Sequence, residues 1–392
     1  MLGSPWSSGR LMLVCCALAS SLAAPSARAQ GGPPPEGSVK LGGEIQTRYV
    51  AVRRGAGADS VDAGFQIRRA RLVVSGWFLS PQLTFRVRPS YDRATGNLQF
   101  DDVWVAYGRD DGLKVKVGQY KPDVLREEII PNFSELAVEA SYASTYFGLD
   151  YTQALQLSWG GGRWRPSLLV HDGSYGANTD FNADRVTVAV AGRLELLAAG
   201  NWASFAGSSG WSAATRGVLL GVAADYERGQ RALSRPSPDV VKVTADVSAV
   251  RPGASLLAAI YAQHFTMRWG GAGAAPTGLN GADQLGLLAQ VGWFAVRDRV
   301  ELLGRYEWMD LGGVYYRNSG GALQAGSRNL SASHLRIATA GLNYYLRGDA
   351  AKLSLDLQWT GDPVPVDNTG VGLLRFDRGN EVALRTQFQW KF

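Results

Sequence analysis

The chain has 392 residues, of which 46% are hydrophobic and 19% are charged, and its formal net charge is +6 at pH 7. Beyond the N-terminal region no apolar run approaches the roughly 20 residues that a membrane-spanning helix needs, which excludes an α-helical membrane protein. Both cysteines, Cys15 and Cys16, lie near the N-terminus, so the rest of the chain can form neither a disulfide nor a thiolate metal site.

Residues 1–29 have the features of a secretory signal peptide. Arg10 precedes the apolar run Leu11–Ala24, and Ala27-Arg-Ala29 is a small-x-small cleavage motif, so we expect cleavage after Ala29. A lipid-modified cysteine is the alternative, but Val14 rather than a small residue precedes Cys15. Residues 30–38 form a Gly/Pro-rich lead, because prolines here cannot pair in a sheet.

From Val39 onward, segments of alternating polar and apolar residues are separated by turn residues, which is the pattern of β-strands. In hydrocarbon every backbone N–H and C=O must be paired, so without spanning helices only a closed barrel can cross the membrane. We therefore predict an all-β fold, a transmembrane antiparallel β-barrel of sixteen strands over residues 39–392. The predicted strands are 39–53, 63–79, 82–92, 97–108, 112–120, 145–159, 163–171, 184–197, 214–226, 238–249, 254–268, 283–296, 298–310, 333–347, 350–361 and 379–392.

Two places depart from simple alternation. In the second predicted strand, Arg68 and Arg69 are adjacent, and a β-bulge there would turn both arginines into the lumen. The longest connection, residues 121–144, is rich in proline and charge, and connections of this length are usually functional or disordered. It is a candidate constriction loop, because a loop that folds inward here would narrow a wide barrel, and the sequence leaves open whether it does so. The candidate residues are Lys121, Arg126, Glu127 and Glu128.

The last predicted strand has two distinct faces. One face carries Val382, Leu384, Thr386, Phe388, Trp390 and Phe392, and the other carries Glu381, Arg385, Gln387, Gln389 and Lys391. An apolar face toward lipid and a polar face toward the lumen are typical of outer-membrane barrels. We expect 39–53 to pair with this strand to close the barrel, and the barrel-assembly machinery to bind the strand that ends in Phe392.

Four stretches carry a family resemblance: Phe65–Leu72, Gly112–Pro122 with Arg126–Glu128 after it, Glu301–Tyr306 and Thr339–Gly348. On these residues the chain resembles the phosphate-selective porin O and P family over nearly the whole mature chain. The resemblance implies a trimeric, sixteen-stranded porin of a Gram-negative-type bacterium, surrounded by outer-membrane lipid and lipopolysaccharide. It does not imply phosphate selectivity, and Ser255–Tyr261 departs from relatives that often place a glutamate before the tyrosine.

Positive charge is concentrated in the first five predicted strands. Residues 39–121 contain fourteen Lys and Arg against eight Asp and Glu, whereas residues 122–392 contain 24 and 25. Rings of basic side chains favour anions in pores, although pairing with Glu44 or Asp102 would give these residues a structural role instead. The basic side chains expected on the lumen wall are Lys40, Arg48, Arg69, Arg71, Arg86, Arg88, Lys114 and Lys116.

No other pattern indicates a reactive site. His171, His264 and His334 are far apart in sequence, and Asp180–Asp184 lacks the glycine and the final glutamate of a calcium loop. We expect no metal, no cofactor, no nucleic-acid partner and no enzymatic activity. The predicted function is a passive outer-membrane channel for small hydrophilic solutes, with an anion preference of the phosphate or polyphosphate type. The alternatives are an outer-membrane β-barrel enzyme and a secreted all-β protein that binds carbohydrate through its aromatic residues.

Overall fold

A computed structural model describes the chain from Gly37 onward, so the predicted signal peptide and residues 30–36 of the predicted lead lie outside the described residues, whereas Gly37 and Ser38 of the lead begin the first strand. Among the described residues no helix is long and apolar enough to cross a membrane. They all belong to one compact unit, Gly37–Phe392. The described residues are 37–53, 61–93, 95–181, 186–212, 215–229, 237–268, 281–312, 315–317, 323–325, 334–362, 364, 370–374 and 381–392.

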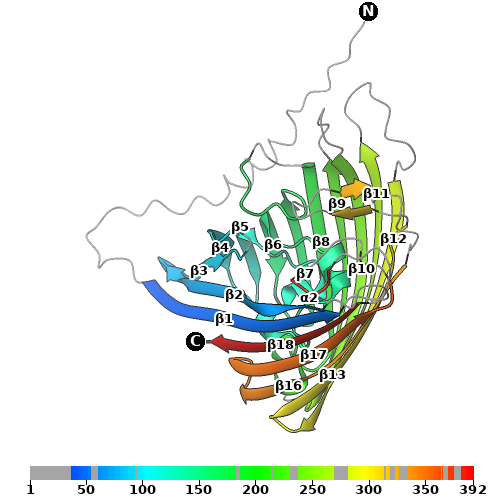
Figure 1. Ribbon diagram of the computed structural model, residues 1–392. Helices are drawn as coiled ribbons and strands as arrows, with labels where there is room; N and C mark the ends of the chain where they lie inside the picture. Colours follow the sequence, from blue (N-terminus) through cyan, green and yellow to red (C-terminus); the bar gives the residue numbers. More distant parts are fainter. Residues whose placement is uncertain are drawn as a thin grey trace, which may run out of the picture. The chain divides into compact units, whose positions relative to one another are not determined.

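Antiparallel strands form a closed barrel in the order β1-β18-β17-β16-β13-β12-β11-β10-β9-β8-β7-β6-β5-β4-β3-β2, and β14 and β15 form a separate two-stranded sheet (Figure 1). The predicted sixteen-stranded barrel is therefore confirmed. The strands are β1 Gly37–Arg53, β2 Val61–Phe78, β3 Ser80–Tyr91, β4 Leu98–Gly108, β5 Leu113–Tyr120, β6 Thr152–Trp159, β7 Trp164–His171, β8 Val186–Ala199, β9 Gly217–Gly229, β10 Ser237–Arg251, β11 Ala254–Arg268, β12 Gly281–Val296, β13 Val300–Asp310, β14 Tyr315–Arg317, β15 Leu323–Ala325, β16 His334–Arg347, β17 Ala351–Thr360 and β18 Glu381–Lys391.

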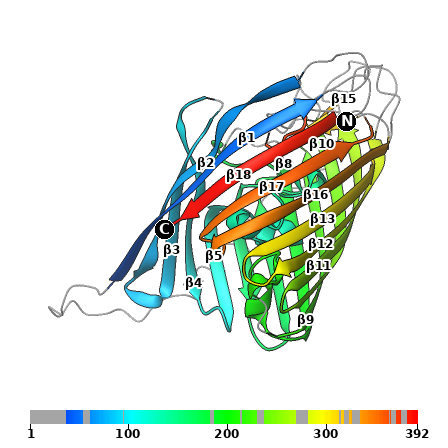
Figure 2. The same ribbon diagram turned by 60° about the horizontal axis from the view of Figure 1, so that its bottom comes forward.

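The barrel closes between its first and last strands, as Figure 2 shows. Glu44 of β1 pairs with Lys391 of β18, and the register continues to Arg53 and Val382. Beyond the end of β18, the backbone of Phe392 exchanges two hydrogen bonds with Gly43, both of 3.1 Å. The predicted closure is confirmed.

The two faces of β18 lie as the alternation predicts. Leu384, Phe388 and Trp390 are exposed on the outside, whereas Arg385 and Gln387 are buried inside. Apolar side chains on the outer surface and polar ones on the inner surface suit a barrel in a lipid bilayer.

A β-bulge interrupts the pairing of β1 with β2. Gln46 lies opposite Arg69 and Thr47 lies opposite Ile67, so Arg68 is the extra residue. Both arginines form ion pairs with the same inward-lying carboxylate, Glu139. The predicted bulge with two inward arginines is confirmed.

One predicted strand begins too early. The alternation predicts that residues 145–151 belong to the sixth strand, but the helix α3 Tyr142–Phe147 occupies part of this range and β6 begins at Thr152. The side chain of Ser141 caps the helix by accepting a hydrogen bond from the N–H of Ser144, which satisfies one of the free N–H groups of the first turn. The other fifteen predicted strands agree with the structure to within three residues at each end.

Candidate functional site: the interior of the barrel

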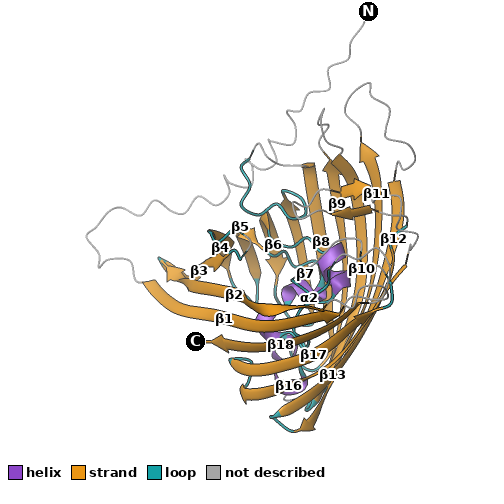
Figure 3. Cartoon of the chain, in the orientation of Figure 1, coloured by secondary structure: helices purple, strands orange, loops and turns teal. Residues whose placement is uncertain are grey.

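The connection between β5 and β6, residues 121–151, lies inside the ring of strands (Figure 3) and contains the short helices α2 Arg126–Ile129, η1 Asn132–Ser134 and α3. We call it the inner loop. Side chains on the last three barrel strands donate hydrogen bonds to its backbone carbonyls. The bonds are Asn343 Nδ2 to Leu136 O at 2.7 Å, Lys352 Nζ to Glu135 O at 2.7 Å and Gln389 Nε2 to Phe133 O at 2.8 Å. The inner loop therefore covers the inner wall of β16, β17 and β18.

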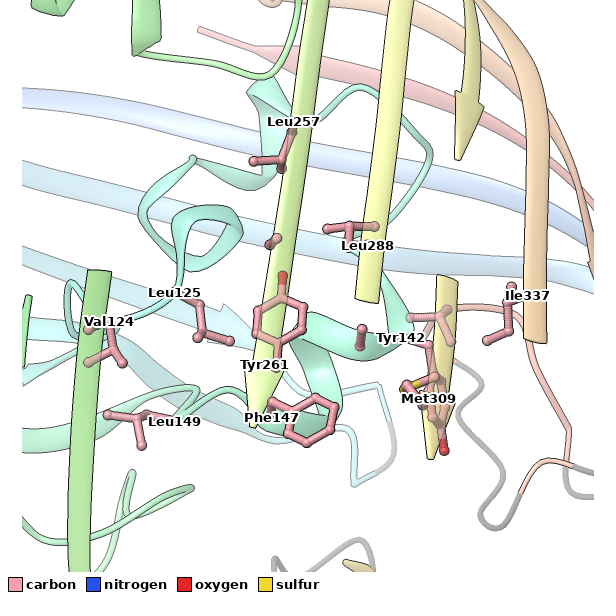
Figure 4. Close-up of a cluster of buried hydrophobic side chains, with 14 of the residues drawn as sticks. Val124, Leu125, Tyr142, Phe147, Leu149, Leu257, Tyr261, Leu288, Met309 and Ile337 are labelled. Atoms are coloured by element: carbon pink, nitrogen blue, oxygen red, sulfur yellow. The ribbon is translucent and has the colours of Figure 1, made fainter. Parts of the chain in front are cut away.

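Apolar packing also holds the inner loop (Figure 4). The ring of Phe147 stacks on Tyr261 of β11, with 5.5 Å between ring centroids. Leu257 and Ala259, on the same inner face of β11, belong to the same buried cluster as Val124, Leu125 and Leu149 of the inner loop. The apolar stretch Ser255–Tyr261, which departs from the family pattern, thus forms a binding surface for this loop inside the barrel.

Glu139 is the electrostatic centre of the inner loop. Its carboxylate accepts hydrogen bonds from Arg48 and lies 2.5 Å from Arg68 Nε and 2.8 Å from Arg69 Nη2. Burial alone would raise the pKa of Glu139, but the three guanidinium groups hold that pKa well below its ordinary value. The buried arginines of β1 and β2 are therefore neutralised by the loop that crosses the lumen.

Two polar cavities remain beside the inner loop. Cavity 1, of about 260 Å³, is bounded by the middle of β2, the end of β3, the start of β4 and the inner loop. Cavity 2, of about 410 Å³, is bounded by β4 to β8 near their short connections and by the inner loop. Both cavities lie on the half of the barrel where the sequence concentrates positive charge.

The charged groups differ between the two cavities. Cavity 2 has an excess of basic side chains, with Arg109, Lys114, Lys116, Arg165 and Arg193 against Asp110, Asp123 and Glu195. Cavity 1 has an excess of acidic ones, with Arg68, Arg69, Arg71, Arg93 and Lys121 against Asp92, Asp101, Glu127, Glu128, Glu135, Glu139 and Asp150. Burial, reinforced by the charge of Glu139, raises the pKa of Glu135 to about 7.

Two cations of cavity 2 stand out because each lies over an aromatic ring. Glu195 lies opposite Arg165 in the register of β7 and β8. Lys116 Nζ lies 3.7 Å from the ring centroid of Tyr120, and the guanidinium of Arg165 lies 3.9 Å from the ring centroid of Trp202. In the described part of the chain, neither forms an ion pair with a carboxylate. Their charges are therefore available to a solute, since ring faces attract cations without neutralising them.

The eight predicted wall residues occupy different environments. Arg69 and Arg71 line cavity 1, and Lys114 and Lys116 line cavity 2. Lys40 is exposed and borders neither cavity. The remaining three residues are Arg48, which is buried against Glu139, and Arg86 and Arg88, which lie 3.7 Å and 3.0 Å from Asp102.

Six of the eight lie close to acidic partners, which are Glu139 for Arg48 and Arg69, Asp101 for Arg71, Asp102 for Arg86 and Arg88, and Asp110 for Lys114. Arg71 lies 2.5 Å from Asp101 and also contacts Glu44, so the alternative structural role applies to it as well as to Arg48, Arg86 and Arg88. The contribution of these residues to ion passage stays a prediction.

The four residues predicted for a constriction are separated in the structure. Lys121, Glu127 and Glu128 line cavity 1, where Lys121 Nζ lies 2.9 Å from Asp150. Arg126 is buried elsewhere and donates to the carbonyl oxygen of Phe205. Burial raises the pKa of Glu128, although the nearby Lys121 opposes this shift.

Sequence reasoning missed the part of the cavity that comes from β7 and β8. Arg165 and Arg193 line cavity 2, and Arg193 forms ion pairs with Glu195 at 3.0 Å and Asp246 at 2.7 Å. The alternation of Arg193 with Glu195 indicates an inward-facing pair, but a net charge count over the segment hides it.

The three histidines lie apart. His171 is buried with its Nε2 3.0 Å from Asp225, whereas His264 and His334 are half-exposed beside Asp283 and Asp310 on strands at the outer surface. Among the described residues, no group of three or more His, Cys, Asp or Glu is arranged to hold a metal ion.

Comparison with known proteins agrees with this architecture. The family model of phosphate-selective porins O and P matches residues 39–221. The chain is similar to this porin family from β1 to the start of β9, which confirms the predicted resemblance there, while the stretches Glu301–Tyr306 and Thr339–Gly348 lie outside the matched range. No curated protein sequence matches the chain.

Solved porin structures share the fold at low sequence identity. An anion-selective porin from Comamonas acidovorans is 14% identical, with a TM-score of 0.59 over 91% of this chain and 100% of that one. OmpT from the outer membrane of Vibrio cholerae is 11% identical, with a TM-score of 0.55 over 90% and 98%. The outer-membrane channel DcaP of Acinetobacter baumannii is 12% identical, with a TM-score of 0.54 over 90% and 97%. At these identities the likeness shows the barrel fold.

Proposed function

We propose that this chain is an outer-membrane porin and passes small hydrophilic anions by passive diffusion along the inner wall formed by β2 to β8. The main support for this proposal comes from cavity 2. There Lys116 and Arg165 contact aromatic rings and have no carboxylate ion-pair partner among the described residues. A low-dielectric wall concentrates the field of such cations and raises the local concentration of anions. The anion selectivity of the Comamonas acidovorans porin is consistent with this proposal.

The burial of the opposite wall supports this route. Glu301, Asn343, Lys352 and Gln389 line the inner face of β13 and β16 to β18, and each is at most 2% exposed. Among the described residues, these buried side chains leave no water-filled path on that side. Arg86 of β3, in contrast, has a side chain that is 40% exposed, and it lies in register with Trp104, which lines cavity 2.

The inner loop acts in this proposal as the constriction between the two cavities. Tyr151 and Lys121, at its two ends, line cavity 1 and face the wall of β3, where Arg88 Nη2 donates to Tyr151 Oη at 2.5 Å. A solute that moves from cavity 1 to cavity 2 passes these groups. Cations along such a path favour anions without specifying which anion, so phosphate and polyphosphate are candidate solutes among small anions.

Reversal potentials across planar bilayers under a salt gradient test the proposal. The purified protein should conduct, and the sign of the potential should show a preference for anions. A cation preference or neutrality would overturn the anion preference. Competition among chloride, phosphate and pyrophosphate then ranks the solutes.

We also propose that the barrel has no enzymatic activity. His171 is the only buried histidine among the described residues, and its ring lies between Asp225 and the N–H of Gly173. Nearby, Lys242 Nζ lies 2.6 Å from Ser174 Oγ but is ion-paired with Asp225 and Glu227. Neither His171 nor Lys242 lines cavity 1 or cavity 2, where a substrate would have access. Esterase or protease activity that is lost in His171→Ala would contradict this conclusion.

A trimer is the assembly that we propose, through the outer face of β1 to β4. Residues Val61–Ala70 of β2 pair with β1, and β3 pairs with β2 only from Arg71 onward. Among the described strands, none pairs with the second edge of Val61–Ala70, and large apolar side chains, among them Phe65 and Leu98, are exposed. Both features are costly unless another copy covers them. Native mass spectrometry should show three copies, and Phe65→Asp should shift the population toward monomer. A wild-type monomer would contradict it.

Export and insertion complete the proposal. Signal-peptide cleavage after Ala29 and recognition of the β18 strand by the barrel-assembly machinery account for how such a chain reaches the outer membrane. N-terminal sequencing of the mature protein tests the first, and removal of Phe392, which should reduce the amount in outer-membrane fractions, tests the second.

A further inference from the structure

One connection at the short-turn end of the barrel is unlike its neighbours. Bacterial outer-membrane barrels have short turns on the periplasmic side and longer loops outside. The other connections at this end are residue 79 and residues 109–112, 160–163, 252–253, 297–299 and 348–350, whereas the β8–β9 connection occupies residues 200–216. It contains the short helices η2 Trp202–Phe205 and η3 Gly210–Ser212.

This connection reaches the opposite wall of the barrel. Ser209 Oγ lies 2.8 Å from each carboxylate oxygen of Glu301 on β13. The ring of Trp211 stacks on Tyr345 of β16, with 4.8 Å between centroids. Gly210 contacts the β10–β11 turn so closely that a Cβ there would lie 2.5 Å from the nitrogen of Ala254. Residues 201–211 therefore span the interior from β8 to β13 and β16, and we call them the plug.

The plug also contacts the inner loop, which enters the barrel from the other end. The N–H of Ser208 donates to Ser134 O at 2.9 Å, and the guanidinium of Arg126 donates to Phe205 O. Ser209, Phe205 and Arg126 are all nearly inaccessible to water. The two segments thus form one continuous layer that fills the lumen beside β10 to β18.

On the other side the plug ends at cavity 2. Trp202 lies at the first turn of the plug, and its ring is covered by the guanidinium of Arg165, which lines that cavity. The indole Nε1 of Trp202 donates to the carbonyl oxygen of Gly162, at 2.9 Å, in the β6–β7 turn. The plug therefore has a fixed edge, and this edge is the boundary of the open part of the lumen.

We infer that the plug is a specificity-determining element, which closes the β10–β18 side of the lumen from the periplasmic end and confines solutes to the passage beside Lys114, Lys116 and Arg165. The inference rests on the proposed diffusion function. A passage bounded by a fixed edge admits small anions that touch the basic wall and excludes bulky solutes. Without the plug, ions would pass farther from these charges, and their field would be screened by the intervening water.

Replacement of residues 202–212 by two glycines tests the inference in the full-length protein. Because conductance follows the cross-section of the pore, single-channel conductance should rise by about twofold or more. Larger polyethylene glycols should enter, and the anion-to-cation permeability ratio should fall toward one. Unchanged conductance, size limit and permeability ratio in a variant that keeps heat-modifiable migration would overturn the inference. A wild-type protein that does not conduct would instead contradict the proposed function.

Point variants keep the test valid if the shortened protein does not fold. Ser209→Ala combined with Trp211→Ala removes both anchors on the far wall, and Trp293→Ala is a matched control because Trp293 is 56% exposed on the outer surface near the same end. The double variant should raise conductance and produce fluctuating current levels, while the control should match the wild type. Identical single-channel currents for the double variant and the control would overturn the inference that Ser209 and Trp211 hold the plug on the far wall.

Discussion

The ammonium group of Lys116 lies 3.7 Å from the ring centroid of Tyr120, and in the described structure no carboxylate forms an ion pair with it. Lys116→Gln together with Arg165→Gln removes the two such cations of cavity 2. Each contributes on the order of 1 kcal/mol to an anion about 4 Å away in a watery cavity, so the loss of both, about 2 kcal/mol, should lower the anion-to-cation permeability ratio by roughly thirtyfold. Reversal potentials measure this ratio. Arg297→Gln, at an exposed turn outside both cavities, is the control and should leave the ratio unchanged.

Arg86 and Arg88 provide a second test of the basic wall. Replacement of both by alanine leaves Asp102 without its two arginine partners, so the passage becomes more negative and anion preference should decrease. Asp102→Asn should act in the opposite direction, because it releases the two guanidinium charges. An equal effect of both changes on the reversal potential would show that this pair does not face the conducting path.

Glu139 should be essential for the packing of the inner loop. Glu139→Gln leaves Arg48, Arg68 and Arg69 without their shared carboxylate, and removal of one partner from a buried ion pair costs about 3–5 kcal/mol. We expect a lower thermal unfolding temperature and a noisier open-channel current. Asp111→Asn, which breaks an exposed ion pair with Arg109, should change neither quantity. An undisturbed Glu139→Gln variant would show that the inner loop is held by apolar packing alone.

Glu135 should make the channel sensitive to pH. Burial raises the pKa of Glu135 from 4.5 to about 7, the charges of Glu139 and Glu127 act in the same direction, and Arg69 opposes them. Between these values the folded protein holds a proton that the unfolded chain releases, so the free energy of unfolding falls as pH rises through this window.

Above about pH 7 the ionised Glu135 also adds a negative charge to cavity 1, so the anion-to-cation ratio should fall between about pH 5 and about pH 8. Glu135→Gln should flatten both profiles, which denaturant titrations and reversal potentials measure. A Glu135→Gln profile that still follows the wild type would assign the pH dependence to another group.

The strands could be predicted because their period is imposed by geometry. Successive side chains in a strand point to opposite faces, so every second residue of β17 or β18 faces lipid and the residues between them face the lumen. The adjacent Arg68 and Arg69 interrupt this alternation, and only a β-bulge places two successive charged residues on the side away from lipid. These features depend on neighbours in sequence.

The interior could not be predicted in the same way, because its contacts join residues that are distant in sequence. Tyr142–Phe147 contains aromatic and β-branched residues that suit a strand, and it became helix because Phe147 packs on Tyr261 of β11. The plug has the small polar residues of an ordinary surface loop, and its inward course depends on Glu301 and Tyr345. Arg165 lies in the range 122–392, where 24 basic and 25 acidic residues balance, so a charge count does not single it out.

The hydrogen bonds from Asn343, Lys352 and Gln389 to the inner loop impose an order on assembly. The loop is made early, between β5 and β6, yet the donors that fix it belong to the last three barrel strands. Until β18 meets β1, the loop carbonyls lack these hydrogen-bond donors, and Arg48 lacks its contact with Gln387 of β18. Maturation of the pore lining and sealing of the wall are therefore a single late event, and an incompletely inserted chain would expose an unfinished interior to the quality-control machinery of the envelope.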